Sequence, residues 1–421
     1  MIGAVLIFSG FIKIGSEDQE TLVRQPVTLW GSVSSQIIDN ILKKTFEAGD
    51  KFDVTYTEIS PSEIEAKLID ALAAGKGPDL VILPHTLVLK QRDKLLLLPT
   101  TAVSERQFRD AFVESSEILI DATGISALPI YADPIVMYWN RDSFTRAGIS
   151  SPPTSWLEVQ LLPERLVVRD NVGNITEAAV GLGGVGNITH FKDVLATQIM
   201  QTGNGIVVPS IALTGGAEPQ LAPEVVISSA GGADSALRYF VEFANPNLPK
   251  YSWNSAKRNS LDEFIAGYLA MYFGKASDEV LISERNPHLN FDVAQIPQVS
   301  STDRRVTYAD IYAMAVLNNS SNKQSAFAVA YQMSFGNAAK FFADALGLPP
   351  ARRDLLSISA TSSSQAVFYA ASVISKSWYD PYPLLTDGIF ADMIEDVMIG
   401  KSNAINAINT ADGRLRDILN Q

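Results

Sequence analysis

The chain contains no cysteine. This absence excludes disulfide bonds, metal sites built on thiolates, a cysteine nucleophile and a lipid-modified N-terminal cysteine. Histidine is scarce as well, because the sequence holds only His85, His190 and His288, which are far apart and outside any H-E-x-x-H pattern. A histidine-rich metal site is therefore not expected. A calcium site made of carboxylates alone stays open.

Basic residues are fewer than acidic residues. The sequence has 33 Lys and Arg residues against 46 Asp and Glu residues, which gives a formal net charge of -13. Binding to the phosphates of nucleic acids needs a surplus of Lys and Arg. We therefore expect no nucleic-acid partner, and an acidic soluble surface is the simplest interpretation.

Long apolar runs are missing too. Residues Ile2 to Ile14 are apolar apart from small residues and Lys13, but a membrane-spanning helix needs about 20 residues. The run also lacks the basic leading region and the cleavage site of a secretory signal. It is either the distal half of a membrane anchor whose upstream part lies outside this numbering, or a buried N-terminal helix or strand. We expect residues 1–25 to be an anchor remnant and tether, the only part that meets a membrane.

Familiar catalytic patterns are absent. The sequence has neither Gly-x-Ser-x-Gly nor the phosphate-binding G-x-x-x-x-G-K-[ST]. The run Gly181 to Gly186 fits G-x-G-x-x-G, but no Asp or Glu stands about 20 residues later, as dinucleotide binding requires. We interpret it as a glycine-rich turn and expect no cofactor. No pair of carboxylates stands in a recognisable catalytic motif, so the sequence identifies no residues for a glycosidase.

What the sequence does contain is an alternating α/β pattern. Its 421 residues suffice for two or three domains. From Pro26 the apolar periodicity predicts β-α-β-α-β, with strands at Val27–Trp30, Phe52–Ile59 and Asp79–Leu83. The second helix has a clear start at Ser60-Pro61, because serine caps helices and proline suits a first turn. This order implies a parallel sheet.

The pattern continues to the end of the chain. Further strands are predicted at Ala178–Leu182, Leu269–Phe273, Phe291–Ile296 and Ile311–Leu317. Further helices are predicted at Phe191–Thr202, Ala233–Phe243, Ser260–Ala266, Asp278–Glu284, Lys323–Leu346, Ser362–Ile374, Gly388–Met398 and Ser402–Leu419. The Gly- and Pro-rich segment from Gly203 to Gly232 is expected to be an exposed loop.

Two strand ends carry residues suited to a ligand. Trp30-Gly31-Ser32 follows the first strand, and His85 follows the strand that begins at Asp79. Ligands of open α/β sheets bind at the carboxyl ends of the strands. An indole ring there can stack on the apolar face of a sugar.

Several segments together resemble the extracellular solute-binding proteins of ABC importers, in the branch that includes maltose-binding protein. The stretch ALPIYADPIVMYWNRDSFTRAGISSPPTSWLEV, Ala127 to Val159, is similar to the family's Leu-Pro strand, its Y-x-N-x-D-x-F-x-x-A-G run, and the Pro, Thr and Trp that follow. FIAGYLAM, Phe264 to Met271, resembles F-x-x-G-x-x-A-M, and GKGPDL resembles G-x-x-P-D. The chain departs from the family where Phe273 to Asp278 replaces an expected Gly-Ser-Trp.

The resemblance implies a two-lobed fold of the periplasmic-binding-protein type (type II). Each lobe would be a mixed sheet flanked by helices, and the C-terminal region would be helical. Lobe 1 would hold residues 26–132 and 291–335, and lobe 2 residues 133–290 and 336–421. Tyr131-Ala132-Asp133-Pro134 would form the crossing between the lobes.

The resemblance also implies a function. A solute, expected to be a saccharide, would be captured in a cleft between the lobes outside the cytoplasm and delivered to an ABC-type permease, without catalysis. The expected ligand-binding residues are Trp30, Ser32, Asp79, His85, Tyr131, Asp133, Tyr138, Phe273, Trp378 and Tyr379. The alternatives are a module that senses or captures the ligand without transport, and a secreted carbohydrate-active enzyme.

Overall fold

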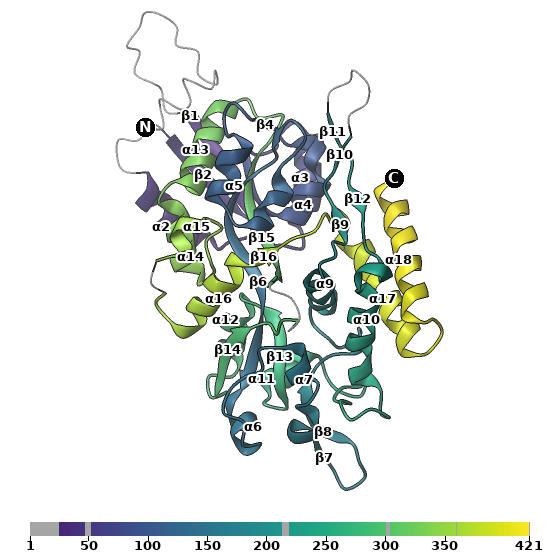
Figure 1. Cartoon of the computed structure of the whole chain (residues 1–421). Helices are drawn as coiled ribbons and strands as arrows, with labels where there is room; N and C mark the ends of the chain where they lie inside the picture. Colours follow the sequence, from purple (N-terminus) through teal and green to yellow (C-terminus); the bar gives the residue numbers. More distant parts are fainter. Residues whose placement is uncertain (1–24, 47–51, 213–218, 300–303, 359, 421) are drawn as a thin grey trace, which may run out of the picture. The chain divides into compact units, whose positions relative to one another are not determined.

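The computed structural model describes residues 25–46, 52–212, 219–299, 304–358 and 360–420 (Figure 1). The proposed anchor remnant and tether lie outside the described residues, apart from Gln25. The described chain divides into two compact units. Unit 1 comprises the described residues up to Ala132 together with Ile211–Ala222 and Asp310–Ile358, and unit 2 comprises Asp133–Ser210, Pro223–Ala309 and the described residues after Ser359.

Apart from Ile211–Ala222, which belongs to unit 1, the chain passes from one unit to the other after Ala132, after Ala309 and after Ile358. The bounds expected from the sequence lay after residues 132, 290 and 335. The reason for the second of the observed bounds is a continuous strand, β15 (Thr307–Val316), whose later half pairs with the sheet of unit 1. Strand β14 (Phe291–Gln295) pairs instead with strand β6 (Leu128–Asn140) along its unit 2 part.

Unit 1 is built on a mixed sheet. Its order is β2-β1-β3-β15, in which β1 runs parallel to both β2 and β3 while β15 is antiparallel to β3. Val27 and Leu29 in β1 are fully buried and alternate with exposed residues, as the period of two predicts. The elements of the sheet and the first helices are β1 (Gln25–Gly31), α2 (Ser35–Thr45), β2 (Phe52–Glu58), α3 (Ile64–Ala73), β3 (Leu80–Pro84) and α4 (His85–Lys90).

Shorter elements and a helical layer complete unit 1. They are η1 (Arg92–Lys94), β4 (Leu98–Pro99), α5 (Glu105–Ala111), η2 (Glu114–Leu119), β5 (Gly124–Ile125), β10 (Ile211–Ala212), β11 (Gln220–Leu221), α13 (Lys323–Phe335), α14 (Ala338–Leu346) and α15 (Arg353–Leu356). Helix α13 packs on β1, and α14 packs on α2.

Unit 2 is also a mixed sheet with helices. Strand β6 pairs antiparallel with β13 and β14, and β13 pairs parallel with β8. The elements from the sheet onward are α6 (Arg141–Arg146), α7 (Trp156–Val159), α8 (Pro163–Leu166), β7 (Val168–Arg169), β8 (Ile175–Val180), α9 (Phe191–Gln201), β9 (Val207–Val208), β12 (Glu224–Val225), η3 (Ser229–Gly231), α10 (Ala233–Val241), η4 (Glu242–Ala244), α11 (Ser260–Ile265), β13 (Leu269–Lys275) and α12 (Asp278–Arg285).

The C-terminal region of unit 2 is helical, as predicted. It contains α16 (Ser363–Val373), β16 (Ser375–Lys376), α17 (Pro383–Met398) and α18 (Ala404–Leu419). Helices α17 and α18 pack side by side and against α10 (Figure 1). The two units therefore have the fold class predicted from the sequence, an α/β fold with a mixed sheet in each.

Strand β6 includes the residues that were expected to cross between the lobes. It runs unbroken from Leu128 through Asp133-Pro134 to Asn140. A residue before proline favours the extended conformation. Proline lacks only the N–H group, and the Pro134 carbonyl still accepts a hydrogen bond from the backbone N–H of Ala276 at 2.9 Å. Pro134 can therefore lie inside a strand.

Two other expectations were wrong in detail. The helix predicted from Lys323 to Leu346 is split at Gly336, where an added Cβ would lie 2.3 Å from the Gln332 carbonyl oxygen. The segment from Gly203 to Gly232 is not an exposed loop throughout, because Ile206, Val207 and Val225 are buried. Two short strand pairs, β9–β12 and β10–β11, order its described residues.

The Gly181 to Gly186 run forms a turn in which one glycine is required. Gly183 has a φ of +104°, and a Cβ there would lie 2.6 Å from the backbone nitrogen of Ala244. A Cβ at Gly184 would meet no atom within 4 Å. The run therefore allows close packing between the end of β8 and η4.

We predict that Gly183→Ala destabilises unit 2 by about 2–4 kcal/mol, since the variant combines an unfavourable backbone conformation with overpacking. Gly184→Ala is the matched control and should change stability by less than about 0.5 kcal/mol. Urea unfolding followed by tryptophan fluorescence measures both. Equal midpoints for the two variants would contradict the packing role of Gly183.

Candidate ligand-binding residues

The carboxyl ends of β1 and β3 form one edge of the unit 1 sheet. Trp30 pairs in register with Val81 of β3, and its side chain is half-buried, as is that of Ser32. Gly31 between them is closely approached, because a Cβ there would lie 3.1 Å from the Tyr56 hydroxyl oxygen. That hydroxyl donates to the Val33 carbonyl at 2.6 Å and holds the turn in place. Trp30 and Ser32 therefore stand partly open on a rigid turn.

Asp79 and His85 stand at opposite ends of β3. Asp79 precedes the strand and is 8% exposed, and its Oδ2 accepts hydrogen bonds from the N–H and hydroxyl of Thr28, both at 2.9 Å. Its Oδ1 accepts from the hydroxyl of Ser320 at 2.5 Å. Asp79 thereby joins β3 to β1 and to the segment after β15, at the edge opposite Trp30.

His85 is fully buried behind the same edge as Trp30. Its Nδ1 accepts from the backbone N–H of Ile311 at 3.3 Å and lies 3.8 Å from Oδ1 of Asp310. His85 fixes the start of the unit 1 part of β15 against β3.

A stacked pair of tyrosines lies on the crossing strands within unit 1. The rings of Tyr131 on β6 and Tyr312 on β15 are 4.7 Å apart with an interplanar angle of 15°. Tyr131 is buried and also packs on Phe342, whereas Tyr312 is half-buried and lies opposite Pro84 at the carboxyl end of β3. Sequence reasoning missed Tyr312, although a tyrosine in an otherwise apolar strand next to β3 was a usable signal.

The expected site residues of unit 2 are all buried. Asp133 accepts hydrogen bonds from the N–H and hydroxyl of Ser277, at 2.9 and 2.6 Å. Tyr138 is fully buried and donates to the Lys275 carbonyl at 2.7 Å. Burial raises the pKa of Tyr138 well above its ordinary value, so it remains a neutral donor. Phe273 packs edge-on against Trp156 at 5.2 Å.

Trp378 and Tyr379 lie next to α9 and α17. The Trp378 ring stacks on Phe390 at 5.9 Å, with Nζ of Lys192 over it at 5.8 Å. Lys192 is held by the carboxylates of Asp380 and Asp387, at 3.0 and 2.6 Å. Tyr379 is 8% exposed and donates its backbone N–H to Val207. These contacts fix α17 on α9.

A charged cluster that the sequence did not reveal lies in unit 2, and we call it the α9–β13 cluster. It comprises His190, Asp193, Lys275 and Asp278. Nε2 of His190 is 3.1 Å from Oδ2 of Asp278, and Nζ of Lys275 is 3.4 Å from Oδ2 of Asp193. His190 has a φ of +58°, the only positive φ of a non-glycine residue in the described chain. Its members lie up to 88 residues apart, so no local pattern could join them.

Electrostatics within this cluster favour the charged form of Asp278. Burial raises its pKa, but hydrogen bonds and charge from His190 lower it, as do hydrogen bonds from Tyr272 and the Lys275 N–H. The lowering contributions prevail, and the pKa of Asp278 lies below its ordinary value. Asp278 therefore stays ionised well into the acid range.

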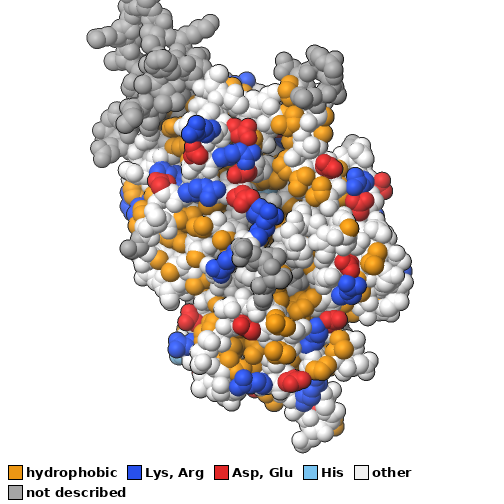
Figure 2. Space-filling model, viewed as in Figure 1, with side chains coloured by type: hydrophobic (Ala, Val, Ile, Leu, Met, Phe, Trp, Pro, Cys, Tyr) orange, Lys and Arg blue, Asp and Glu red, His pale blue; other side chains and the backbone are white. Residues whose placement is uncertain are grey.

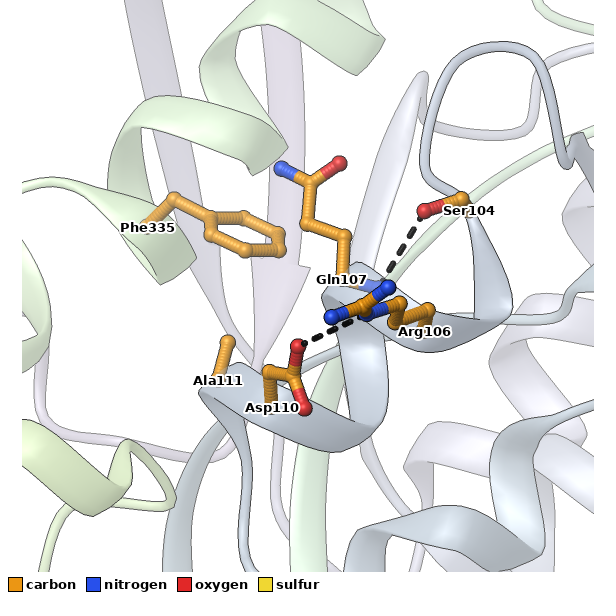
Figure 3. Close-up of a pocket in the computed structure, with 6 residues that line it drawn as sticks. All are labelled: Ser104, Arg106, Gln107, Asp110, Ala111 and Phe335. Carbon is orange, nitrogen blue, oxygen red and sulfur yellow. Dashed lines mark hydrogen bonds and ion pairs between the residues drawn. The ribbon is translucent and has the colours of Figure 1, made fainter.

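A separate shallow hollow of about 520 Å³ lies in unit 1 between α5 and α13. Figure 3 shows the Phe335 ring extending from α13 toward Gln107, beside the ion pair of Arg106 and Asp110. Arg106 and Asp110 are strongly exposed and already paired.

Positive and negative side chains are interspersed on the face of the molecule seen in Figure 2.

Comparison with known proteins decides the family. The family described as bacterial extracellular solute-binding protein matches residues 42–368, more than half of the chain. The chain belongs to this family. The resemblance seen in the sequence is thereby confirmed, and this is a family of extracellular binding proteins rather than enzymes.

Individual relatives of this solute-binding protein agree. A Brucella abortus (strain 2308) protein that is named as a binding protein is 25% identical over 313 residues, 73% of this chain and 70% of that protein. The cyclic alpha-maltosyl-1,6-maltose binding protein of Arthrobacter globiformis gives a TM-score of 0.76 at 17% identity, covering 94% of this chain and 99% of that one. The GacH receptor of Streptomyces glaucescens, solved unliganded and with acarbose, gives 0.69 at 16% identity, covering 94% and 98%. These two structures show the shared fold.

Among the helices that the structure describes, none has the length and apolar character needed to cross a membrane. Nor does the described part of the chain contain three His, Asp or Glu side chains grouped so that they could hold a metal ion.

The α9–β13 cluster predicts a specific acid sensitivity. The folded pKa of Asp278 lies below its unfolded value of about 3.9, so its contribution to stability is present above that pH and is lost as the pH falls through the folded pKa. We expect Asp278→Asn to lower the unfolding free energy by about 1.5–3 kcal/mol at pH 7. The difference from the unaltered protein should shrink below about pH 3.9.

Urea unfolding at several pH values between 7 and 3 measures this difference. Glu279→Gln, which removes the neighbouring carboxylate of α12, is the control and should not reproduce the pattern. A deficit of Asp278→Asn that stays constant or grows in acid would show that the carboxylate is not stabilised by these partners.

Proposed function

We propose that this solute-binding protein captures a carbohydrate and delivers it to an ABC-type permease without altering it chemically. The observation that carries the proposal is the pair of half-buried aromatic residues, Trp30 and Tyr312, at the carboxyl edge of the unit 1 sheet. Partly open rings on rigid strands suit the apolar face of a sugar ring. Ser32, which follows β1 close to Trp30 in the sequence, can exchange hydrogen bonds with sugar hydroxyls.

The comparisons support the same ligand class. The Arthrobacter protein is named for binding a cyclic maltosyl-maltose, and a further similar structure, with a TM-score of 0.73 at 14% identity, is a cyclo/maltodextrin-binding protein complexed with maltotetraose. The fold is shared across 94% and 96% of this chain. We take a saccharide as the ligand on these grounds.

Unit 2 taken by itself also has partly exposed charged groups. The side chains of Lys275 and Asp193 in the α9–β13 cluster are 19% and 11% exposed. Lys275 stands within the stretch that replaces the Gly-Ser-Trp expected from the family. Charge-assisted hydrogen bonds from such groups to hydroxyls are about twice as strong as neutral ones.

The residues predicted from the sequence divide into two groups under this proposal. Trp30 and Ser32 are proposed to contact the ligand directly. The others are proposed to hold the contacting groups in place, because their polar atoms bond within the protein or their rings are buried. These are Asp79, His85, Tyr131, Asp133, Tyr138, Phe273, Trp378 and Tyr379.

The proposed setting is outside the cytoplasm, and the apolar run of residues 2–14 is the part we assign to membrane attachment. Adjacent permease genes would support import, whereas their absence would favour capture or sensing of the ligand without transport. Prolonged incubation with saccharides tests for catalysis. Reversible binding without products is expected, and turnover would instead identify a carbohydrate-active enzyme.

A thermal-shift screen of sugars, oligosaccharides, amino acids and peptides tests the ligand class. A saccharide at about 100 times its Kd stabilises the folded protein by about 2.7 kcal/mol and should raise the melting temperature measurably. We expect a saccharide to give the largest shift. A shift produced by peptides alone would overturn the carbohydrate assignment.

Trp30→Ala tests the stacking role. We expect it to weaken binding of the saccharide found in the screen by about 10-fold or more, because a ring contact is lost. The apo melting temperature should change little. Trp253→Ala is the contrasting control, since Trp253 is 1% exposed and its loss should cost about 3–5 kcal/mol of stability. Unchanged affinity in Trp30→Ala, measured by isothermal titration calorimetry, would remove Trp30 from the site.

A further inference from the structure

Unit 2 contains a second pocket that the proposed function does not use. Its volume is about 370 Å³, and it lies between α7, α9, α10 and the segment after β14. The residues on which the inference rests are Trp156, Gln160, Gln198, Thr202, Tyr239 and Val299. Ligand pockets in proteins begin at about 300 Å³ and are mostly apolar with a few polar groups.

Helix α9, which forms the floor of the pocket, is buried almost all round yet carries several polar side chains. Such groups need partners, because an unsatisfied buried polar group costs about 1–3 kcal/mol. Lys192 and Asp193 have ion pairs, and the Thr197 hydroxyl donates to the Asp193 carbonyl. Gln201 accepts from Trp156 Nε1 at 2.6 Å and donates to the Pro297 and Val306 carbonyls.

Gln198 is the exception. It is 3% exposed and lines the pocket, and neither its Oε1 nor its Nε2 has a hydrogen-bond partner among the described residues. One turn separates it from Gln201, whose amide is fully used. Each of these two atoms has less than 1 Å² of accessible surface, so the unpaired donor and acceptor lie just behind the pocket wall, and the side chain has to rotate to present them to a ligand. An unpaired buried amide of this kind calls for an explanation.

The other walls are aromatic and apolar, and their polar atoms are occupied. The Trp156 and Tyr239 rings meet edge to face at 5.7 Å. The Tyr239 hydroxyl donates to the Trp156 carbonyl at 2.7 Å, and the Thr202 hydroxyl donates to the Ile199 carbonyl at 2.7 Å. Two cations next to the pocket are also paired: Lys250 with Glu242, lying over the Tyr239 ring at 5.0 Å, and Arg238 with Asp234. The pocket therefore combines the unpaired amide of Gln198 with flat apolar surfaces.

The geometry points to a binding site for a small, uncharged, planar cyclic amide, a lactam or nucleobase-like molecule. A carboxamide presents its N–H and C=O side by side, so its complement is an edge that also carries a donor next to an acceptor. Pairing of the two edges satisfies both atoms of Gln198 at once. The ring of the ligand would pack against Trp156 and Tyr239, and its neutrality matches the lack of an unpaired charge.

The site is tested with the full chain and 2-quinolinone, a two-ring lactam, with naphthalene as the probe that lacks the amide edge. Isothermal titration calorimetry and quenching of tryptophan fluorescence report binding. We expect 2-quinolinone to bind more tightly than naphthalene. Gln198→Leu should weaken lactam binding by about 5- to 100-fold, the loss of two neutral hydrogen bonds.

Gln160→Leu is the matched control, because Gln160 is a half-buried amide that lines the same pocket and already accepts a hydrogen bond from Lys250 at 3.4 Å. Its lactam affinity should stay within about 3-fold of the unaltered protein, a difference of less than about 1 kcal/mol. Urea midpoints of both variants establish folding. Gln198→Leu should be at least as stable as the unaltered chain, since it removes an unsatisfied buried amide.

Side-chain amide resonances provide a second readout that does not depend on any variant. On titration with 2-quinolinone, the Gln198 NH₂ signals and the Trp156 indole N–H signal should both shift in proton–nitrogen spectra. Equal binding of naphthalene and 2-quinolinone, undiminished lactam binding by folded Gln198→Leu, or an unshifted Gln198 amide would each overturn the proposal. Saccharide binding is measured separately, so the two proposals can fail independently.

Discussion

The structure depends on a strand that passes through the boundary between the units without interruption. In β6, Tyr131 and Ala132 belong to unit 1, and Asp133 is the first residue of unit 2. The Asp133 carboxylate holds Ser277, and the Pro134 carbonyl holds the N–H of Ala276. The same strand therefore fixes the turn after β13, on which Lys275 and Asp278 depend for their positions. In unit 1 it fixes Tyr131, and through the stacked rings it also fixes Tyr312.

Most of the fold follows from short-range sequence signals. The strands β1, β2 and β3 were predictable because period-two patterns act within about ten residues. The capping signal at Ser60-Pro61 was less exact, because residues 61–63 form a turn and α3 begins at Ile64 without a capping side chain. The break at Gly336 was not predictable, because the contact that requires glycine is with the Gln332 carbonyl and becomes visible only in the folded helix. The boundary at Ala309 was also out of reach. It depends on which strands β15 pairs with, and those partners lie more than 200 residues earlier.

The positions of the candidate site residues follow the same distinction. Trp30 and Ser32 could be placed at one edge of the sheet because they end a strand, and the carboxyl ends of parallel strands share an edge. For His85 the same reasoning gave the right edge, but burial gives the ring a supporting contact with Ile311. The α9–β13 cluster had no local signal. His190 and Asp278 are brought together only when β8 and β13 pair and place the start of α9 beside the end of β13.

The two glutamines of α9 are buried more deeply than a sequence pattern would indicate. A period-based reading would place Gln198 and Gln201 on a polar face, yet both are almost fully buried. Gln201 tolerates burial because its amide oxygen accepts one hydrogen bond and its NH₂ group donates two. The Gln198 amide makes no hydrogen bond with the described residues, although it lies on the same helix and is the same type of side chain. Since an uncompensated amide costs stability that an apolar side chain of similar size would not, its presence at a pocket wall is better explained by a partner outside the chain than by packing.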